Sequence, residues 1–134
     1  MIDIENDVFS YVAEAIRTAH SGTYVVGEFV DVPASFPAVT IVEADNRVYE
    51  RMRTLNIENA ANVMYECNVY TNKAFGKKAQ AKAIATTMDE AFASIGFTRT
   101  FREQVPNLNN ATIYRIVCRY EATIGKDFMI YQNY

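Results

Sequence analysis

The chain has few of the residues that build metal centres or disulfide frameworks. Its 134 residues include two cysteines and one histidine, and no Cys-x-x-Cys pair occurs. Because a structural zinc site needs about four such ligands at close spacing, the sequence argues against zinc binding. Cys67 and Cys118 fall in stretches with a strand pattern. We expect both to be small buried hydrophobic side chains.

Long apolar runs are also missing. No stretch reaches the roughly 18 consecutive apolar residues that a membrane-spanning helix needs. The first seven residues carry three acids and no base, so they lack the basic start of a secretory signal. We therefore expect a protein that is made and folds in the cytoplasm and has no membrane partner.

The composition favours one folded domain over residues 1–134. Half of the residues are apolar and 13% are aromatic, which is enough material for a core. A chain of this length usually forms a single domain.

The charges are unevenly distributed along the chain. Residues 1–45 hold eight acids and one base, whereas residues 46–134 hold twelve bases and eight acids. The overall net charge of −3 argues against a dedicated nucleic-acid binder. A dipolar chain of this kind is suited to contacting copies of itself or partners of opposite charge.

Two segments have the period of amphipathic helices. Residues 3–20 place Val8, Val12, Ala15, Ile16 and Ala19 on one face. Residues 74–95 carry a second apolar stripe, which consists of Ala81, Ile84, Ala85, Met88, Ala91, Phe92 and Ile95. Such stripes predict that both helices pack on a sheet.

Six segments have strand character: residues 23–30, 38–43, 47–55, 61–72, 97–104 and 111–124. Asp45-Asn46 suits a hairpin turn between the second and third, although 47–55 could instead be a short helix. The last segment would span about 48 Å if fully extended, so it should bend at a bulge or leave the domain as an arm.

The predicted fold is therefore α+β, in the order α-β-β-β-β-α-β-β. Hairpin-like connections favour a mostly antiparallel or mixed sheet with two helices packed on one face. Residues 46–60 are expected to protrude as a hairpin or loop. Residues 125–134 form a C-terminal tail, and its apolar part, 128–131, should dock on this domain or a neighbour.

Catalytic chemistry finds little support in the residue pattern. His20 is expected to cap the first helix, since a cation is favoured at a helix C-terminus. Asp89 and Glu90 are adjacent on a helix and point about 100° apart, so they should not converge. Glu43 and Asp45 could point the same way from a strand end, but further metal ligands are missing. We expect no enzyme, no cofactor and no metal.

A phosphate-binding loop is also rejected. Gly76-Lys77-Lys78 lacks both the upstream glycine and the following Ser or Thr of such loops.

Two basic stretches are the candidate contact surfaces. Lysines crowd the first half of the second helix, where the helix dipole disfavours cations. They read either as a solvated face or as a contact with an acidic patch, such as the N-terminal third of a neighbouring copy. The second stretch combines arginine with tyrosine, as interface hot spots do, although phosphate contact competes. The candidate interface residues are Arg47, Tyr49, Arg51, Arg53, Lys73, Lys77, Lys78 and Lys82.

Several motifs in order resemble the tail terminator, or tail completion, proteins of long-tailed bacteriophages. They are Val32-Pro-Ala-Ser-Phe-Pro37, Glu58-Asn59, Tyr65-Glu-Cys-Asn-Val-Tyr-Thr-Asn72, Gly76-Lys-Lys78, Gly96-Phe-Thr-Arg99 and Tyr114-Arg-Ile-Val-Cys-Arg-Tyr120. The similarity covers roughly residues 24–131, and the order of the motifs carries it.

The resemblance implies a virion protein at the head-proximal end of the tail, assembled in the host cytoplasm. Such proteins form a ring, usually a hexamer, that caps the tail tube, stops its polymerisation and joins the head connector. The implied partners are further copies of the chain, the tail tube protein and the head–tail connector protein. DNA would be met only in the ring lumen.

Two alternatives stay open. One is another head–tail joining or head completion protein. The other is a small ferredoxin-like ligand-binding or isomerase domain, for which Tyr65, Arg115 and Glu121 are the only candidate pocket residues.

Overall fold

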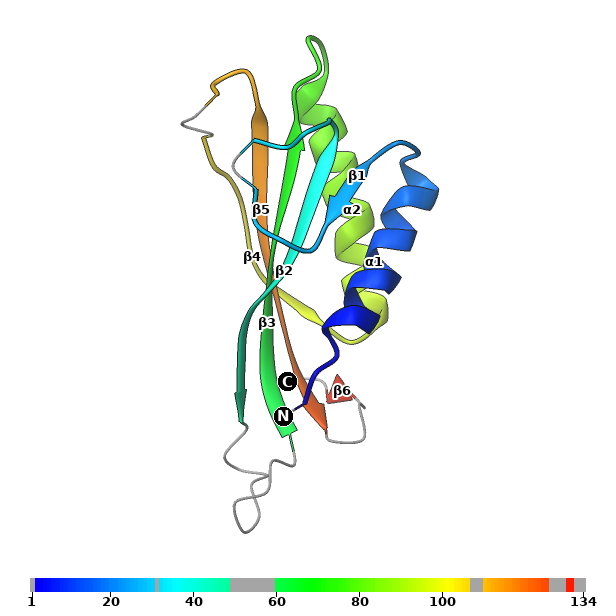
Figure 1. Ribbon diagram of the computed structural model, residues 1–134, viewed down its shortest axis with the longest axis vertical. Coiled ribbons are helices and arrows are strands. Elements are labelled where there is room, and N and C mark those ends of the chain that lie inside the picture. Colours follow the sequence, from blue (N-terminus) through cyan, green and yellow to red (C-terminus); the bar gives the residue numbers. More distant parts are fainter. Residues whose placement is uncertain (1, 31, 49–59, 107–109, 126–129, 132–134) are drawn as a thin grey trace.

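The computed structural model describes residues 2–30, 32–48, 60–106, 110–125 and 130–131. Within these residues, two helices and six strands follow one another (Figure 1). They are α1 (Glu5–Ala19), β1 (Tyr24–Val26), β2 (Ala38–Val48), β3 (Ala60–Thr71), α2 (Lys77–Ser94), β4 (Thr98–Gln104), β5 (Tyr114–Gly125) and β6 (Ile130–Tyr131). The predicted α+β class is confirmed.

The strands form one mixed sheet in the order β1-β2-β3-β5-β4, and β6 pairs with β5. Only β1 and β2 are parallel among these pairs, and the others are antiparallel. Both helices lie on the same face of the sheet and contact each other, as predicted (Figure 1).

The region predicted as two strands joined by a turn is one continuous strand as far as it is described. Asp45 and Asn46 are paired with Met64 and Val63 of β3, and the register shifts by one residue between Glu43 and Asp45. The extra residue is absorbed as a β-bulge, so the strand continues instead of reversing. The prediction of a turn at Asp45-Asn46 was therefore wrong, and residues 49–55 lie outside the described part.

The expectation for the last strand was also wrong. Every residue of β5 from Tyr114 to Gly125 pairs with β3 without a register shift. Because β3 is equally long, β5 needs neither a bulge against it nor an arm. The described part of the tail, β6, docks on β5 of its own domain through the pairs Thr123–Tyr131 and Ile124–Ile130.

The helix stripes form the core largely as predicted. Six of the seven predicted α2 positions are buried, and Ile95 packs against them half-buried. In α1, Val8, Val12 and Ile16 are buried as predicted. Ala13 is also buried, whereas Ala19, which was predicted to be buried, is exposed. This face of the sheet contributes alternate residues of β2, β3 and β5 to the same core.

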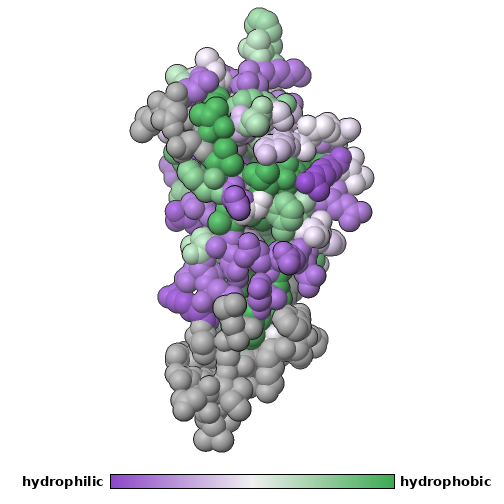
Figure 2. All heavy atoms as spheres, viewed as in Figure 1, coloured by the Kyte–Doolittle hydropathy of each residue, from purple (hydrophilic) through white to green (hydrophobic). Residues whose placement is uncertain are grey.

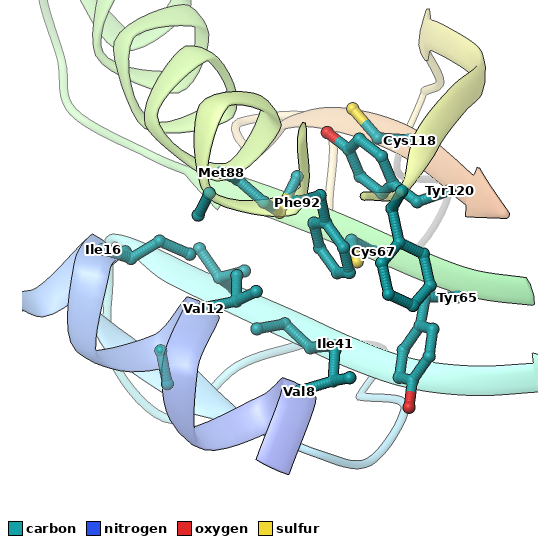
Figure 3. Close-up of a cluster of buried hydrophobic side chains, with 14 of the residues drawn as sticks. Val8, Val12, Ile16, Ile41, Tyr65, Cys67, Met88, Phe92, Cys118 and Tyr120 are labelled. Atoms are coloured by element: carbon teal, nitrogen blue, oxygen red, sulfur yellow. The ribbon is translucent and has the colours of Figure 1, made fainter. Parts of the chain in front are cut away.

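Four aromatic rings fix α2 on the sheet (Figure 3). Phe92 stacks on Tyr120 with ring centroids 4.1 Å apart and planes 10° from parallel. It also meets Phe97 edge-on at 5.3 Å and Tyr65 at 5.9 Å. Phe92 therefore brings α2 into contact with both β3 and β5.

The opposite face of the sheet carries a polar ladder and is partly covered. Asn68 accepts a hydrogen bond from Arg115 at 2.8 Å, and Thr123 donates one to Asn62 at 2.7 Å. The segment between β1 and β2 contacts this face, where the Tyr70 hydroxyl donates to the carbonyl of Val30. In the view of Figure 2, hydrophobic atoms gather near the centre of the upper half, and hydrophilic atoms lie around and below them.

Neither described helix is both long and apolar enough to cross a membrane.

Replacing Phe92 by alanine should lower the free energy of unfolding by about 3–5 kcal/mol, because it removes a buried ring and leaves a cavity. Phe75 provides the matched control, since its side chain is 88% exposed. Phe75→Ala should change stability by less than about 0.5 kcal/mol. Urea denaturation followed by circular dichroism measures both, and equal effects would contradict the central place of Phe92.

Candidate functional site

Three carboxylates meet where α1 begins. One oxygen each from Asp3, Glu5 and Glu43 lies within 4.8 Å of the others. Asp3 and Glu5 are exposed, and Glu43 is half-buried. We call this group the acidic cluster. It joins the start of α1 to the middle of β2.

The bulge in β2 decides which acid belongs to the acidic cluster. Glu43 is paired with Tyr65, whose side chain faces the helices. After the bulge, Asp45 is paired with Met64, so it faces the opposite side of the sheet. The expectation that Glu43 and Asp45 could point the same way was therefore wrong.

The Asn46 side chain links the acidic cluster to the N-terminal segment by hydrogen bonds. Its side-chain amide donates to the carbonyl of Ile2 at 2.8 Å and to Glu43 Oε1 at 3.0 Å. On the helix side, the backbone N–H of Glu5 donates to Asp3 Oδ1 at 3.1 Å. These bonds fix the N-terminal segment and one Glu43 oxygen relative to each other.

Tyr65 is the residue of β3 paired with Glu43, and its hydroxyl has no hydrogen-bond partner. Tyr65 is fully buried, and its hydroxyl is one of the buried polar atoms left unpaired. Figure 3 shows this hydroxyl pointing away from Tyr120, on the side of the core where Val8 and α1 lie. An unpaired buried hydroxyl costs about 1–3 kcal/mol.

The electrostatics of the acidic cluster are repulsive. Burial raises the pKa of the Glu43 carboxyl, and the neighbouring charges of Glu5 and Asp3 raise it further, while the hydrogen bond from Asn46 opposes both. Burial also raises the pKa of Tyr65, with Glu43, Glu5 and Asp3 as the acids that add to it. The site therefore favours a proton or another cation among its carboxylates.

Sequence reasoning missed the acidic cluster. It considered Asp45, and not Asp3 or Glu5, as the acid that could share a face with Glu43. The contact joins residues about 40 positions apart, and only the bulge register brings them together.

Two of the predicted lysines line an open basic groove between α2 and β4. This groove has a volume of about 340 Å³ and is lined by Lys78, Lys82, Arg102, Glu103, Gln104, Tyr114 and Ile116. Three bases face one acid there, so the groove suits an acidic partner. Arg102 was not singled out from the sequence, because its approach to α2 depends on how the edge strand lies.

The other two predicted lysines play different parts. Lys77 donates to the carbonyl of Thr112 at 3.1 Å, and the Thr71 hydroxyl donates to the carbonyl of Lys77. Lys77 thereby ties the helix start to the segment before β5. Lys73 is exposed in the loop before α2 and does not line the basic groove. Phe75, in the same loop, is 88% exposed.

The arginine stretch is described only at its beginning. Arg47 pairs with Asp45 at 2.8 Å on the face of the sheet away from the helices. Both line a hollow of about 200 Å³ together with Asn62 and Glu121. The predicted interface residues Tyr49, Arg51 and Arg53, like most of residues 46–60, lie outside the described part.

The remaining sequence candidates separate in space. His20 is the C-cap residue of α1, and its ring bonds the Thr87 hydroxyl of α2 at 2.8 Å. Asp89 pairs with Arg99 at 3.4 Å, whereas Glu90 is exposed. Cys67 and Cys118 are buried free thiols as expected, and burial raises the pKa of both.

The candidate pocket residues do not converge. Tyr65 points into the core on the helix side. Arg115 and Glu121 are on β5 positions that alternate with the buried core residues, so they face the other side.

Comparisons with known proteins identify the fold. No protein-family model and no curated protein sequence matches the chain. Among solved structures, the chain is similar to a chain in the "Virion of native gene transfer agent (GTA) particle", with a TM-score of 0.59 and 18% identity. The match covers 85% of this chain and 91% of the other. The fold is therefore shared almost end to end.

The acidic cluster should make stability depend on pH in metal-free buffer. The pKa of Glu43 in the folded protein is above its usual 4.5, so folding favours the protonated carboxyl. The contribution of Glu43 to the free energy of unfolding is therefore fully present in acid and is lost as pH rises through the folded-state pKa. The glutamine of the Glu43→Gln variant cannot titrate, so the melting temperature of this variant should rise relative to that of the wild type as pH increases. Glu90→Gln, exposed on α2, is the control. A pH-independent difference between Glu43→Gln and wild type would contradict this assignment.

Proposed function

We propose that the chain is a structural subunit of a tailed-phage-type virion and acts as its tail terminator. In this role it forms a ring that caps the tail tube at the head-proximal end, stops tube polymerisation and joins the head connector. The observation that carries the proposal is the fold shared with a chain of a gene transfer agent virion over 85% of this chain. The motifs of this chain that resemble the tail terminator family, and their order along the sequence, also support the proposal.

A closed ring needs a head-to-tail interface between unlike surfaces. The chain offers two surfaces of opposite charge. The basic groove carries Lys78, Lys82 and Arg102, and α1 exposes Asp7 and Glu14 beside the acidic cluster. We propose that the basic groove of one copy receives the acidic N-terminal surface of the next.

Phe75 is proposed to be a second contact. A phenylalanine that is 88% exposed in a loop between a strand and a helix gains from burial against a partner. Its loop lies at the end of the molecule beyond β3 and α2 (Figure 1). That position suits a contact along the tube axis with the tail tube protein or the head connector protein.

The proposed role requires neither a reaction nor a cofactor. Another head–tail joining component of the same fold would also form rings, but it would occupy a different level of the particle. DNA is proposed to meet the chain only in the ring lumen.

The test of the assembly is the mass and shape of the purified protein. Light scattering and negative-stain images should show closed rings of about six copies with interfaces above roughly 1,000 Å². A species that stays monomeric or dimeric up to high concentration, with a bound small molecule, would instead favour a ligand-binding domain.

Reversing the charge of the basic groove should weaken self-association. The double variant Lys78→Glu and Lys82→Glu should shift the ring to smaller species, with at least a tenfold loss of association if each contact contributes about 1 kcal/mol. Both side chains are exposed, so the fold should be unaffected. Lys77 is left unchanged, because it bonds within the domain.

Lys73→Glu is the matched control, since it makes the same kind of charge change outside the basic groove. It should leave the oligomer mass unchanged. Normal rings from the double variant, or an equal loss with Lys73→Glu, would overturn the assignment of the groove.

A further inference from the structure

We propose that Asp3, Glu5 and Glu43 bind a hard divalent cation, with Ca²⁺ preferred, and that the ion joins the start of α1 to β2. The three carboxylates belong to two segments about 40 residues apart, yet an oxygen of each lies within 4.8 Å of the others. Such a spacing allows all three to coordinate one ion at about 2.3–2.6 Å after small side-chain adjustments.

The second observation is the Tyr65 hydroxyl. Tyr65 is fully buried, its hydroxyl has no hydrogen-bond partner, and its paired residue on the neighbouring strand is Glu43 of the acidic cluster. Because Glu43 and Tyr65 are paired across β2 and β3 and face the same side of the sheet, we infer that water coordinated by a cation in the acidic cluster is the missing partner of this hydroxyl. Tyr65 would then be satisfied as a hydrogen-bond donor or acceptor to that water.

The acidic cluster is partly preorganised. Asn46 holds one Glu43 oxygen and the Ile2 carbonyl, and the N–H of Glu5 holds one Asp3 oxygen. The remaining carboxylate oxygens are left to turn toward an ion. The start of α1 contributes about half a positive charge, which the three carboxylates outweigh.

The chemistry of the donors selects the ion. All three are carboxylates, which favour hard cations over zinc or copper. Ca²⁺ tolerates irregular geometry and takes six to eight oxygens, whereas Mg²⁺ demands a near-ideal octahedron. Two exposed ligands and one half-buried ligand, completed by water, fit Ca²⁺ better.

A thermal-shift titration with Ca²⁺ alone, in chelator-treated buffer at fixed ionic strength, tests the proposal. At a concentration about 100 times Kd, Ca²⁺ should raise the melting temperature of the wild type by roughly 5–10 °C. Mg²⁺ at equal concentration should raise it less. Glu43→Gln and Glu5→Gln should each abolish most of the Ca²⁺ shift. Glu90→Gln, which is exposed on α2 and lies outside the acidic cluster and the basic groove, should keep it.

Terbium luminescence locates the ion. The chain has no tryptophan, so emission from bound Tb³⁺ excited in the tyrosine band depends on a nearby tyrosine. Tyr65→Phe should remove most of the emission, and Ca²⁺ should displace Tb³⁺ from the wild type. Tyr11→Phe, whose ring is exposed on α1, is the control.

The proposal fails if the wild type gains no more stability from Ca²⁺ than from NaCl of equal ionic strength. It also fails if Glu43→Gln and Glu5→Gln respond to Ca²⁺ as the wild type does, because the ion then binds elsewhere. Should Glu43→Gln not fold, Glu5→Gln at the exposed edge decides alone. Neither result depends on whether the protein forms rings.

Discussion

The packing of Phe92 onto β3 and β5 is the contact on which the rest of the structure depends. Phe92 stacks on Tyr120 and touches Phe97 and Tyr65, so one side chain joins α2 to both long central strands. Because α1 packs on α2 and on the same face of the sheet, its position follows from that of α2. The packing of the two helices on the sheet also positions both charged surfaces. The basic groove lies between α2 and β4, and the acidic cluster lies where α1 meets β2.

One extra residue in β2 adds chemistry to this frame. Without the bulge, Glu43 and Asp45 would share a face of the sheet. With it, Glu43 joins Asp3 and Glu5 beside the buried Tyr65 hydroxyl, and Asp45 turns to Arg47 on the other face. The bulge therefore places three carboxylates together at one end of the helix layer. On the opposite face of the sheet, the carboxylate of Asp45 forms an ion pair with Arg47. A hydroxyl left unpaired beside three carboxylates is a local cost that a bound cation would relieve.

The sequence was a good guide to the parts of the fold that depend on local periodicity. The α2 stripe follows from the 3.6-residue repeat of a helix, and six of its seven predicted positions are buried. Predictions failed where a non-local register decided the outcome. Asp45-Asn46 has the composition of a turn, yet pairing with β3 keeps it extended, and the length of β5 is absorbed by an equally long β3. The acidic cluster and the position of Arg102 in the basic groove depend on such strand registers, so no local sequence pattern predicts them.

The role proposed for the chain is to stop the growth of a tail tube. Its most direct test is the length distribution of tubes assembled from the tube subunits of the same particle, with and without this protein. If the chain has this role, the protein, added in small amount, should arrest tubes at a bounded length and be found at one end of each. Tubes of unchanged length, with no protein at either end, would contradict it.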